Sequence, residues 1–224
     1  MVTTNWPPFY SEKMLNGGPL TQVSNEAFKR VGYKVKIEFV PWKRAINLVE
    51  TGKTDALLGA YKNDERLKFA YYSESILGVA KSAIIARKNS RITYDSLEKL
   101  KPYVIGILRG TSVSKKFDSA KAYLGITEHS SESKLIEMLE SGRLDLIAGS
   151  EQVFFSEYKI LYPNRTPSHY LKSVTILNSE AMYNIFSKRT KNGKSLRDAF
   201  DSGFKMIVED GTYGKIMTQH GINQ

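Results

Sequence analysis

The sequence contains no cysteine, and this absence removes several chemistries at once. Disulfide bonds, thiol nucleophiles and zinc–thiolate sites are all excluded. Histidine is also scarce, and His129, His169 and His220 are far apart and lack the spacing of metal ligands. We therefore expect neither a metal site nor a cofactor.

Long apolar runs are absent too, so no stretch of the sequence is suited to span a bilayer. Hydrophobic residues make up 41% of the chain and charged residues 25%, which is typical of a globular protein and not of a disordered one. With 224 residues the chain can bury a sizeable core, as one large domain or as two small lobes.

The net charge of +10 raises the question of nucleic-acid binding. The lysines and arginines are scattered, however, without a block of five like charges, a basic stripe or a helix-turn-helix pattern. A solvated basic surface explains the charge better than a nucleic-acid face, and we expect no nucleic-acid partner. A basic cleft for a small anion is a third explanation.

The first part of the chain alternates between strand and helix patterns. After the Pro-rich turn "NWPPFY", residues 20–32 predict a helix that ends at a glycine, and residues 33–40 alternate as a strand does. Residues 41–52 predict a second helix, with Pro41 at its start, and "DALLGA" predicts a short buried strand. This order favours an α/β fold with a mainly parallel sheet covered by helices.

A second α/β unit begins near residue 94, and "EMLESGRLDLIAG" (137–149) in it parallels "NLVETGKTDALLG" (47–59). The two are related as a repeat, or they show only the general appearance of α/β units. Long extended segments at 75–89 and 173–190 connect the halves, and the tail predicts two helices. We therefore predict one lobe from residues 1–88 plus 179–224 and another from residues 89–178.

Several motifs, taken in order, resemble the periplasmic solute-binding proteins of family 3, the polar amino-acid type that serves ABC transporters. They are "NWPPF", "ETGKTDALLGAYKNDERLKFAYYSES", "GILRGTS", "LESGRLDLIAG" and the terminal "DGTYGKIMTQHGI". The segment that ends in "DERLKFAYYSES" is the most specific, and the resemblance covers nearly the whole chain.

The resemblance implies a two-lobed periplasmic-binding-protein fold of type II, with two hinge strands between the lobes. It implies a monomer that captures a small solute between the lobes by hinge closure and delivers it to a membrane ABC transporter permease. The strands flex near residues 87–89 and 176–179 in this account. The protein is then a periplasmic binding protein and not an enzyme. Because the chain opens in mid-strand, we also expect Met1 to replace a removed secretory leader.

Arg66 is the central candidate for ligand binding. In the amino-acid binders of this family, the arginine in this segment holds the α-carboxylate of the ligand, and a guanidinium fork matches a carboxylate well. The alternative is a structural ion pair with a nearby acid, which is Asp64, Glu65 or Glu74. The family match favours the ligand role.

Four further residues of the first lobe match positions that line the ligand site in the family. Trp6 and Trp42 match aromatic residues that can sandwich a flat, apolar or cationic group. A core role is equally suited to Trp42 and less suited to Trp6, which lies in a Pro-rich turn. Gly59 and Tyr61 match positions that offer backbone and hydroxyl groups to the ligand. Tyr61 is bulkier than the serine or threonine common there, so it would reshape the pocket.

In the second lobe, the resemblance places Thr111 and Ser112 at the start of a helix, where their amides and hydroxyls would point at an anion. Plain N-capping by Ser112 is compatible with that role. Arg109 is a further candidate cation beside the ligand.

The clearest departure from the family is at Ser150. Amino-acid binders usually have an aspartate there that holds the ligand ammonium, whereas this chain has Ser150 followed by Glu151. Glu151 takes over that role if the loop is shifted by one residue. Otherwise the site favours a carboxylate without an ammonium, so the ligand is an amino acid or a related organic acid.

Two other functions use the same fold. A few relatives of the family are dehydratases of cyclic acids, for which Glu151 is the only candidate general acid, and no catalytic triad or phosphate loop accompanies it. A ligand-sensing module is the other alternative. We assign no catalytic residue.

Overall fold

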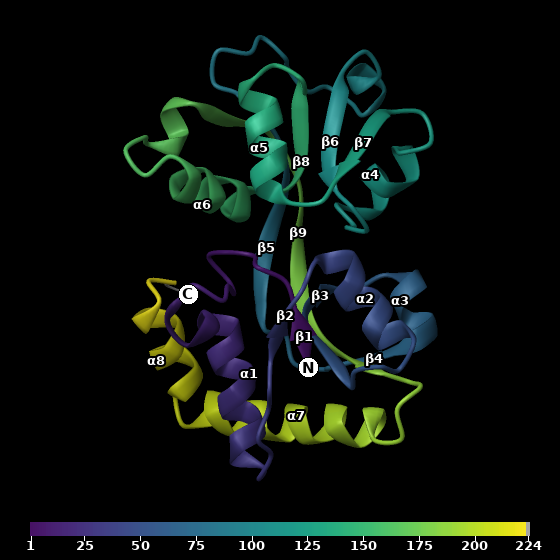
Figure 1. Cartoon of the computed structure of the whole chain (residues 1–224), viewed down its shortest axis with the longest axis vertical. Coiled ribbons are helices and arrows are strands. Elements are labelled where there is room, and N and C mark those ends of the chain that lie inside the picture. Colours follow the sequence, from purple (N-terminus) through teal and green to yellow (C-terminus); the bar gives the residue numbers. More distant parts are fainter. Residues whose placement is uncertain (223–224) are drawn as a thin grey trace. The chain divides into compact units, whose positions relative to one another are not determined.

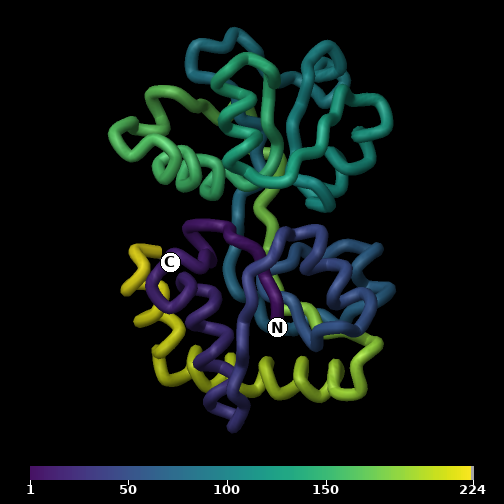
Figure 2. The backbone as a smooth tube through the Cα atoms, in the orientation of Figure 1, coloured from purple at the N-terminus to yellow at the C-terminus, as the bar shows by residue number. Residues whose placement is uncertain are grey.

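A computed structural model describes residues 1–222 of the chain. The chain forms two compact units (Figures 1 and 2). Unit 1 consists of residues 1–79 and 181–222, and unit 2 consists of residues 80–180. Two long strands, β5 (Gly78–Arg87) and β9 (Leu171–Ser187), carry the chain from one unit into the other.

The sheet of unit 1 combines parallel and antiparallel strands. The short strand β1 (Val2–Thr3) lies between β2 (Glu38–Phe39) and β3 (Ala56–Tyr61), parallel to both. The end of β9 pairs antiparallel with β3 and also with β4 (Ala70–Tyr72). β3 is buried along its whole length, as expected for a strand covered on both faces.

Five helices and one 3₁₀ turn complete unit 1. The 3₁₀ turn is Leu15–Gly17, and the helices are α1 (Pro19–Arg30), α2 (Trp42–Glu50), α3 (Asp64–Phe69), α7 (Gly193–Glu209) and α8 (Thr212–Gln219).

α1 and α7 pack against one another in unit 1 (Figure 1). They approach so closely that a Cβ atom on Gly203 would lie 1.9 Å from the carbonyl oxygen of Ala27. The rings of Phe28 and Phe200 meet at this contact, with centroids 5.5 Å apart. Burying each ring contributes about 1.5–3 kcal/mol to stability, so this helix pair is a main part of the core of unit 1.

The strands of unit 2 follow one another in the sheet in the order β5–β8–β6–β7. β8 (Leu146–Ser150) and β7 (Gly125–His129) both run parallel to β6 (Val104–Leu108), while β5 is antiparallel to β8. The helices are α4 (Lys115–Ala120), α5 (Glu132–Glu140) and α6 (Glu151–Leu161), with 3₁₀ turns at Glu98–Leu100 and Pro167–His169.

Both faces of this sheet are covered. Ile84 packs in one apolar cluster with Phe117 of α4, whereas its neighbour Ile85 packs in another with Phe154 of α6. Successive residues of a strand point to opposite faces, so the continuous apolar run of β5 serves both clusters.

Two predicted elements are shorter in the structure than the sequence pattern indicates. Only Glu38 and Phe39 of the predicted strand 33–40 pair with a neighbour, because β1 has only two residues to offer. The helix expected to start at Thr111 and Ser112 is α4, which begins at Lys115 because Ser114, and not Ser112, caps it. Among residues 1–222, no helix has both the length and the apolar character needed to cross a membrane.

Candidate functional site

Arg66 is buried in unit 1, with only 5% of its surface exposed. The side chain of Asn63 caps α3 by accepting a hydrogen bond from the backbone amide of Arg66 at 2.9 Å. This bond fixes the backbone position from which the arginine side chain extends. Its Nη1 donates to the carbonyl oxygen of Tyr61 at 2.8 Å. Its guanidinium carbon lies 5.4 Å from the ring centre of Trp42, a distance typical of a cation–π contact. Backbone and aromatic contacts therefore hold the charge in place.

Trp6, Gly59 and Tyr61 lie beside this arginine in the same cluster. The rings of Trp6 and Tyr61 meet edge to face at 5.9 Å. Tyr10 stacks on Trp6 at 5.6 Å and donates its hydroxyl proton to the carbonyl oxygen of Gly59 at 3.3 Å. A Cβ atom on Gly59 would lie 2.5 Å from that hydroxyl, and its φ is +85°, so both space and backbone favour glycine there.

Tyr10 and Tyr72 are parts of this cluster that the sequence reasoning missed. The hydroxyl of Tyr72 donates to the carbonyl oxygen of Tyr61 at 2.9 Å, the same oxygen that accepts from Arg66. Burial raises the pKa of Tyr72, while the positive charge of Arg66 opposes that shift. The phenol is therefore a neutral donor near pH 7. Tyr72 stands in the motif "DERLKFAYYSES", but nothing in the sequence separates it from Tyr71.

The candidates of the loop after β6 in unit 2 have other partners. Arg109 extends into solvent with 59% of its side chain exposed, and its Nε lies 3.8 Å from a carboxylate oxygen of Glu128. The hydroxyl of Ser112 donates to Asp118, and the carbonyl oxygen of Thr111 accepts from Lys121 at 3.1 Å. These contacts organise the loop, and α4 is capped two residues further on, by Ser114.

Ser150 and Glu151 lie where β8 passes directly into α6. The buried hydroxyl of Ser150 caps α6 by accepting from the amide of Val153 at 3.5 Å. Glu151, the first residue of α6, accepts a hydrogen bond from the hydroxyl of Ser173 in β9. Ser82, directly opposite Ser150 on β5, is fully buried, and its hydroxyl has no hydrogen-bond partner among the described residues. This end of β8 is thus rich in hydroxyls.

The structure brings the five unit 1 candidates into one cluster and places the five unit 2 candidates at or just after the carboxyl ends of two neighbouring parallel strands, β6 and β8. A buried guanidinium among aromatic rings can bind a carboxylate through charge-assisted hydrogen bonds. Where the unit 2 candidates lie, the buried polar groups are the neutral hydroxyls of Ser82, Ser114 and Ser150. Within residues 1–222, no group of histidine and acidic side chains is arranged to hold a metal ion.

Comparisons with known proteins agree on family and fold. The model of the bacterial extracellular solute-binding proteins, family 3, matches residues 1–223. No curated protein sequence matches the chain. Among solved structures, an ancestral arginine-binding protein bound to arginine is 25% identical; 97% of this chain and 96% of that chain are covered, with a TM-score of 0.77.

Two further structures extend this result. The arginine-, lysine-, histidine-binding protein ArtJ from Geobacillus stearothermophilus is 21% identical, with 97% and 93% of the two chains covered and a TM-score of 0.78. A histidine kinase sensor domain with similarity to periplasmic binding proteins is 16% identical over 97% and 93% of the chains, with a TM-score of 0.81. The predicted periplasmic-binding-protein fold is therefore confirmed.

Proposed function

Because the chain belongs to family 3 of the bacterial extracellular solute-binding proteins, we propose that it captures a small solute that bears a carboxylate. The solute is an amino acid or a related organic acid, and the protein presents it outside the cytoplasm to the permease of an ABC transporter. The solved relatives that bind arginine, lysine or histidine support an amino-acid ligand.

The observation that carries this proposal is the fixed position of Arg66. A long, flexible side chain normally loses about 2 kcal/mol of rotamer entropy when a ligand orders it. Here the bond to the Tyr61 carbonyl and the contact with Trp42 already orient the guanidinium, so much of that cost is met before the ligand arrives. Preorganised donors of this kind raise affinity for a carboxylate.

A thermal-shift screen tests the proposal. The natural chain and the variants Arg66→Ala and Arg66→Lys are melted with each standard amino acid and with dicarboxylic and aromatic acids. Ligand binding raises the melting temperature by an amount that grows with the excess of ligand over Kd. We expect Arg66→Ala to weaken the binding of any ligand found by about a hundredfold or more, because it removes charge-assisted hydrogen bonds. Arg66→Lys keeps the charge and loses the fork, so it gives an intermediate loss.

The matched control is Arg44→Ala, which removes an exposed arginine from α2 in the same unit. It lowers the net charge by the same amount and leaves ligand stabilisation intact. If the Arg66→Ala variant melts normally and still binds the ligand as tightly as the natural protein does, the carboxylate site lies elsewhere. The assignment then fails.

The same screen addresses the two alternative functions. A cyclohexadienyl acid that is converted to an aromatic product, seen by its ultraviolet absorbance, identifies a dehydratase, and Glu151 is then the first residue to replace. A ligand that binds without conversion agrees with either transport or sensing. The fold of the sensor domain named above is similar enough to keep sensing as the second candidate.

A further inference from the structure

The connection between β9 and α7 is the most basic segment of unit 1. Residues 188–194 include four cations and no acid; the cations are Lys188, Arg189, Lys191 and Lys194. All four are exposed, and no carboxylate among residues 1–222 forms an ion pair with any of them. Lys68, by contrast, is balanced by Glu65 at 2.8 Å. This segment therefore carries unbalanced positive charge.

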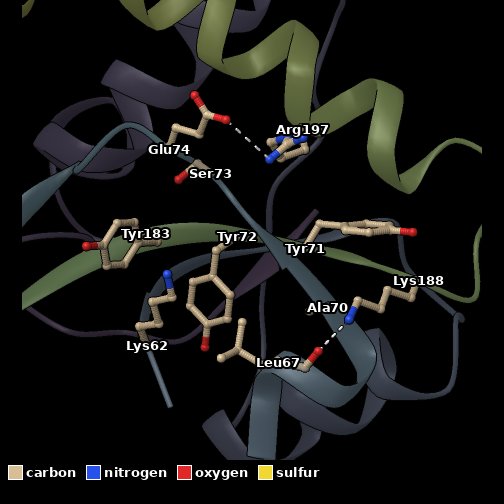
Figure 3. Close-up of a pocket in the computed structure, with 10 residues that line it drawn as sticks. All are labelled: Lys62, Leu67, Ala70, Tyr71, Tyr72, Ser73, Glu74, Tyr183, Lys188 and Arg197. Carbon is tan, nitrogen blue, oxygen red and sulfur yellow. Dashed lines mark hydrogen bonds and ion pairs between the residues drawn. The ribbon is translucent and has the colours of Figure 1, made fainter. Parts of the chain in front are cut away.

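A cavity of about 360 Å³ opens beside this segment, around strand β4 (Figure 3). Its walls are tyrosine rings and cations. Tyr72 points towards Lys62, whose Nζ lies 5.9 Å from the ring centre, and Tyr71 lies on the other side of β4 with the Nζ of Lys188 5.4 Å from its ring. The amine of Lys188 also donates to the carbonyl oxygen of Leu67, which holds it at the wall.

The one carboxylate that lines the cavity does not neutralise it. Glu74 keeps 82% of its side chain exposed and lies 3.7 Å from Arg197, which is itself bonded to Asp198 at 2.6 Å. Lys62 has no ion-pair partner among the described residues and stands at the opposite wall. The cavity thus has cations at both walls and aromatic surface between them, which suits an anionic group attached to an apolar stem.

We propose that residues 188–194 and the cavity form one docking surface for an acidic segment of a protein partner. The carboxylates of the partner would meet the lysines and arginine of 188–194, and an apolar or aromatic side chain would enter the cavity between Lys62 and Lys188. This interaction is separate from solute binding.

A protein segment fits this surface better than an anionic membrane. The residues between the cations, Thr190, Asn192 and Gly193, include no apolar side chain to insert into a bilayer. The aromatic walls lie in a concavity that a flat layer of headgroups does not fill, whereas a single side chain does.

Fluorescence anisotropy with a labelled peptide of alternating glutamate and valine tests the proposal, beside a matched peptide of alternating lysine and valine. The natural chain should bind the acidic peptide, more weakly at high salt, and not the basic one. The double variant Lys191→Glu with Lys194→Glu should bind it about tenfold less well or worse, because two attractions become repulsions. Lys62→Gln should weaken binding by about twofold to threefold through the cavity alone.

The matched control is Lys34→Glu with Lys215→Glu, which makes the same charge change at exposed positions elsewhere in unit 1. It should change peptide affinity by less than about twofold, and all variants should melt with the natural chain, since the substituted lysines are exposed. Equal losses in the two double variants would show unspecific attraction and overturn the proposal.

Two other outcomes would also overturn it. In the first, vesicles of phosphatidylglycerol and phosphatidylcholine compete with the peptide for the natural chain and do not bind the Lys191 and Lys194 double variant. That result would assign the surface to lipid. If that variant binds the peptide normally but self-associates in sedimentation, the lysines serve only to keep copies of the chain apart by charge repulsion.

Discussion

The turn that leads into β3 in unit 1 and the turn that leads into β8 in unit 2 have the same construction. A helix ends, a glycine adopts positive φ at Gly52 (+72°) or Gly142 (+75°), and a buried strand comes after a short link. The same set of amide hydrogen bonds closes both helices; the donors are Thr51, Gly52, Lys53 and Thr54 in one and Ser141, Gly142, Arg143 and Leu144 in the other. The likeness of residues 47–59 and 137–149 thus extends to their hydrogen bonds.

The two regions differ in the residues that come directly after the strand. β3 passes through Tyr61 to the cap Asn63 and the buried cation Arg66, whereas β8 ends at Ser150, which caps the next helix itself. One scaffold therefore carries a charge in unit 1 and a hydroxyl in unit 2. The chemistry that would select a ligand depends on the few residues after each strand and not on the repeated turn.

Among changes that bear on this comparison, Ser150→Asp should have the largest effect, because it puts a charge in place of the neutral hydroxyl at the end of β8. Aspartate caps a helix about as well as serine, so α6 should remain intact. The new carboxylate should favour ligands with an ammonium by about tenfold or more, the range of a charge-assisted hydrogen bond. Thermal shifts with L-glutamate and with glutarate, and with other amino acids and their deaminated acids, measure the change in preference.

Ser195→Asp is the control, because it adds the same charge to the first turn of α7 in unit 1. It should leave the ratio of amino acid to deaminated acid unchanged. If the natural protein already prefers the amino acid of each pair, and Ser150→Asp does not alter that preference, then Ser150 does not face the ammonium of the ligand.

A smaller effect is expected at the two turns themselves, which should differ in how much stability an alanine at the glycine costs. Alanine at either glycine is strained at positive φ by about 1 kcal/mol or more. A Cβ atom on Gly142 meets nothing nearer than the end of the Arg87 side chain at 4.0 Å, whereas one on Gly52 would lie 2.8 Å from the Cβ of Arg189. Gly52→Ala should therefore cost about 2 kcal/mol and Gly142→Ala about 1 kcal/mol.

Hydrogen exchange of the amides in β3 and β8 measures these costs in each unit separately. Equal losses of protection would mean that Arg189 moves aside freely and that the two turns are equivalent in energy as well as in shape.

The smallest effect concerns the support of Arg66, for which unit 2 has no counterpart in the described chain. Tyr72→Phe removes one of the two donors on the carbonyl oxygen of Tyr61. We expect a loss of about 1 kcal/mol in stability and roughly threefold weaker binding of any solute that needs Arg66. Tyr71→Phe, on the other side of β4, is the matched control in a calorimetric titration. A similar loss of affinity in both variants would make the role of Tyr72 merely structural.

Much of the fold can be predicted from local patterns in the sequence. α1 and α2 match their predicted helices because apolar spacing, Pro at the start and Gly at the end all agree. The pattern fails where an element depends on a partner, as residues 33–40 show: alternation is present, but β1 is too short to pair with more than two of them.

The candidate site could be predicted only in part. Arg66 was identified through its motif, but its fixation by Tyr61 and Trp42 and the role of Tyr10 come from residues far apart in the sequence, such as Tyr10 and Gly59. The roles of the ten ligand residues and the hinge closure remain predictions. The sequence predicted that the chain passes between the lobes after residues 88 and 178. In the structure it passes between the compact units after residues 79 and 180.

The discontinuity of unit 1 has a consequence for biosynthesis. Residues 80–180 are contiguous, so unit 2 has all its strands once residue 180 has left the ribosome, while β4 and β3 still lack the end of β9 and α1 still lacks α7. The apolar face of α1, with Val23 and Phe28, therefore stays exposed in the nascent chain until α7 has been synthesised. Chaperones that hold unfolded chains should therefore recognise residues 1–79 and release them only after α7 has been made.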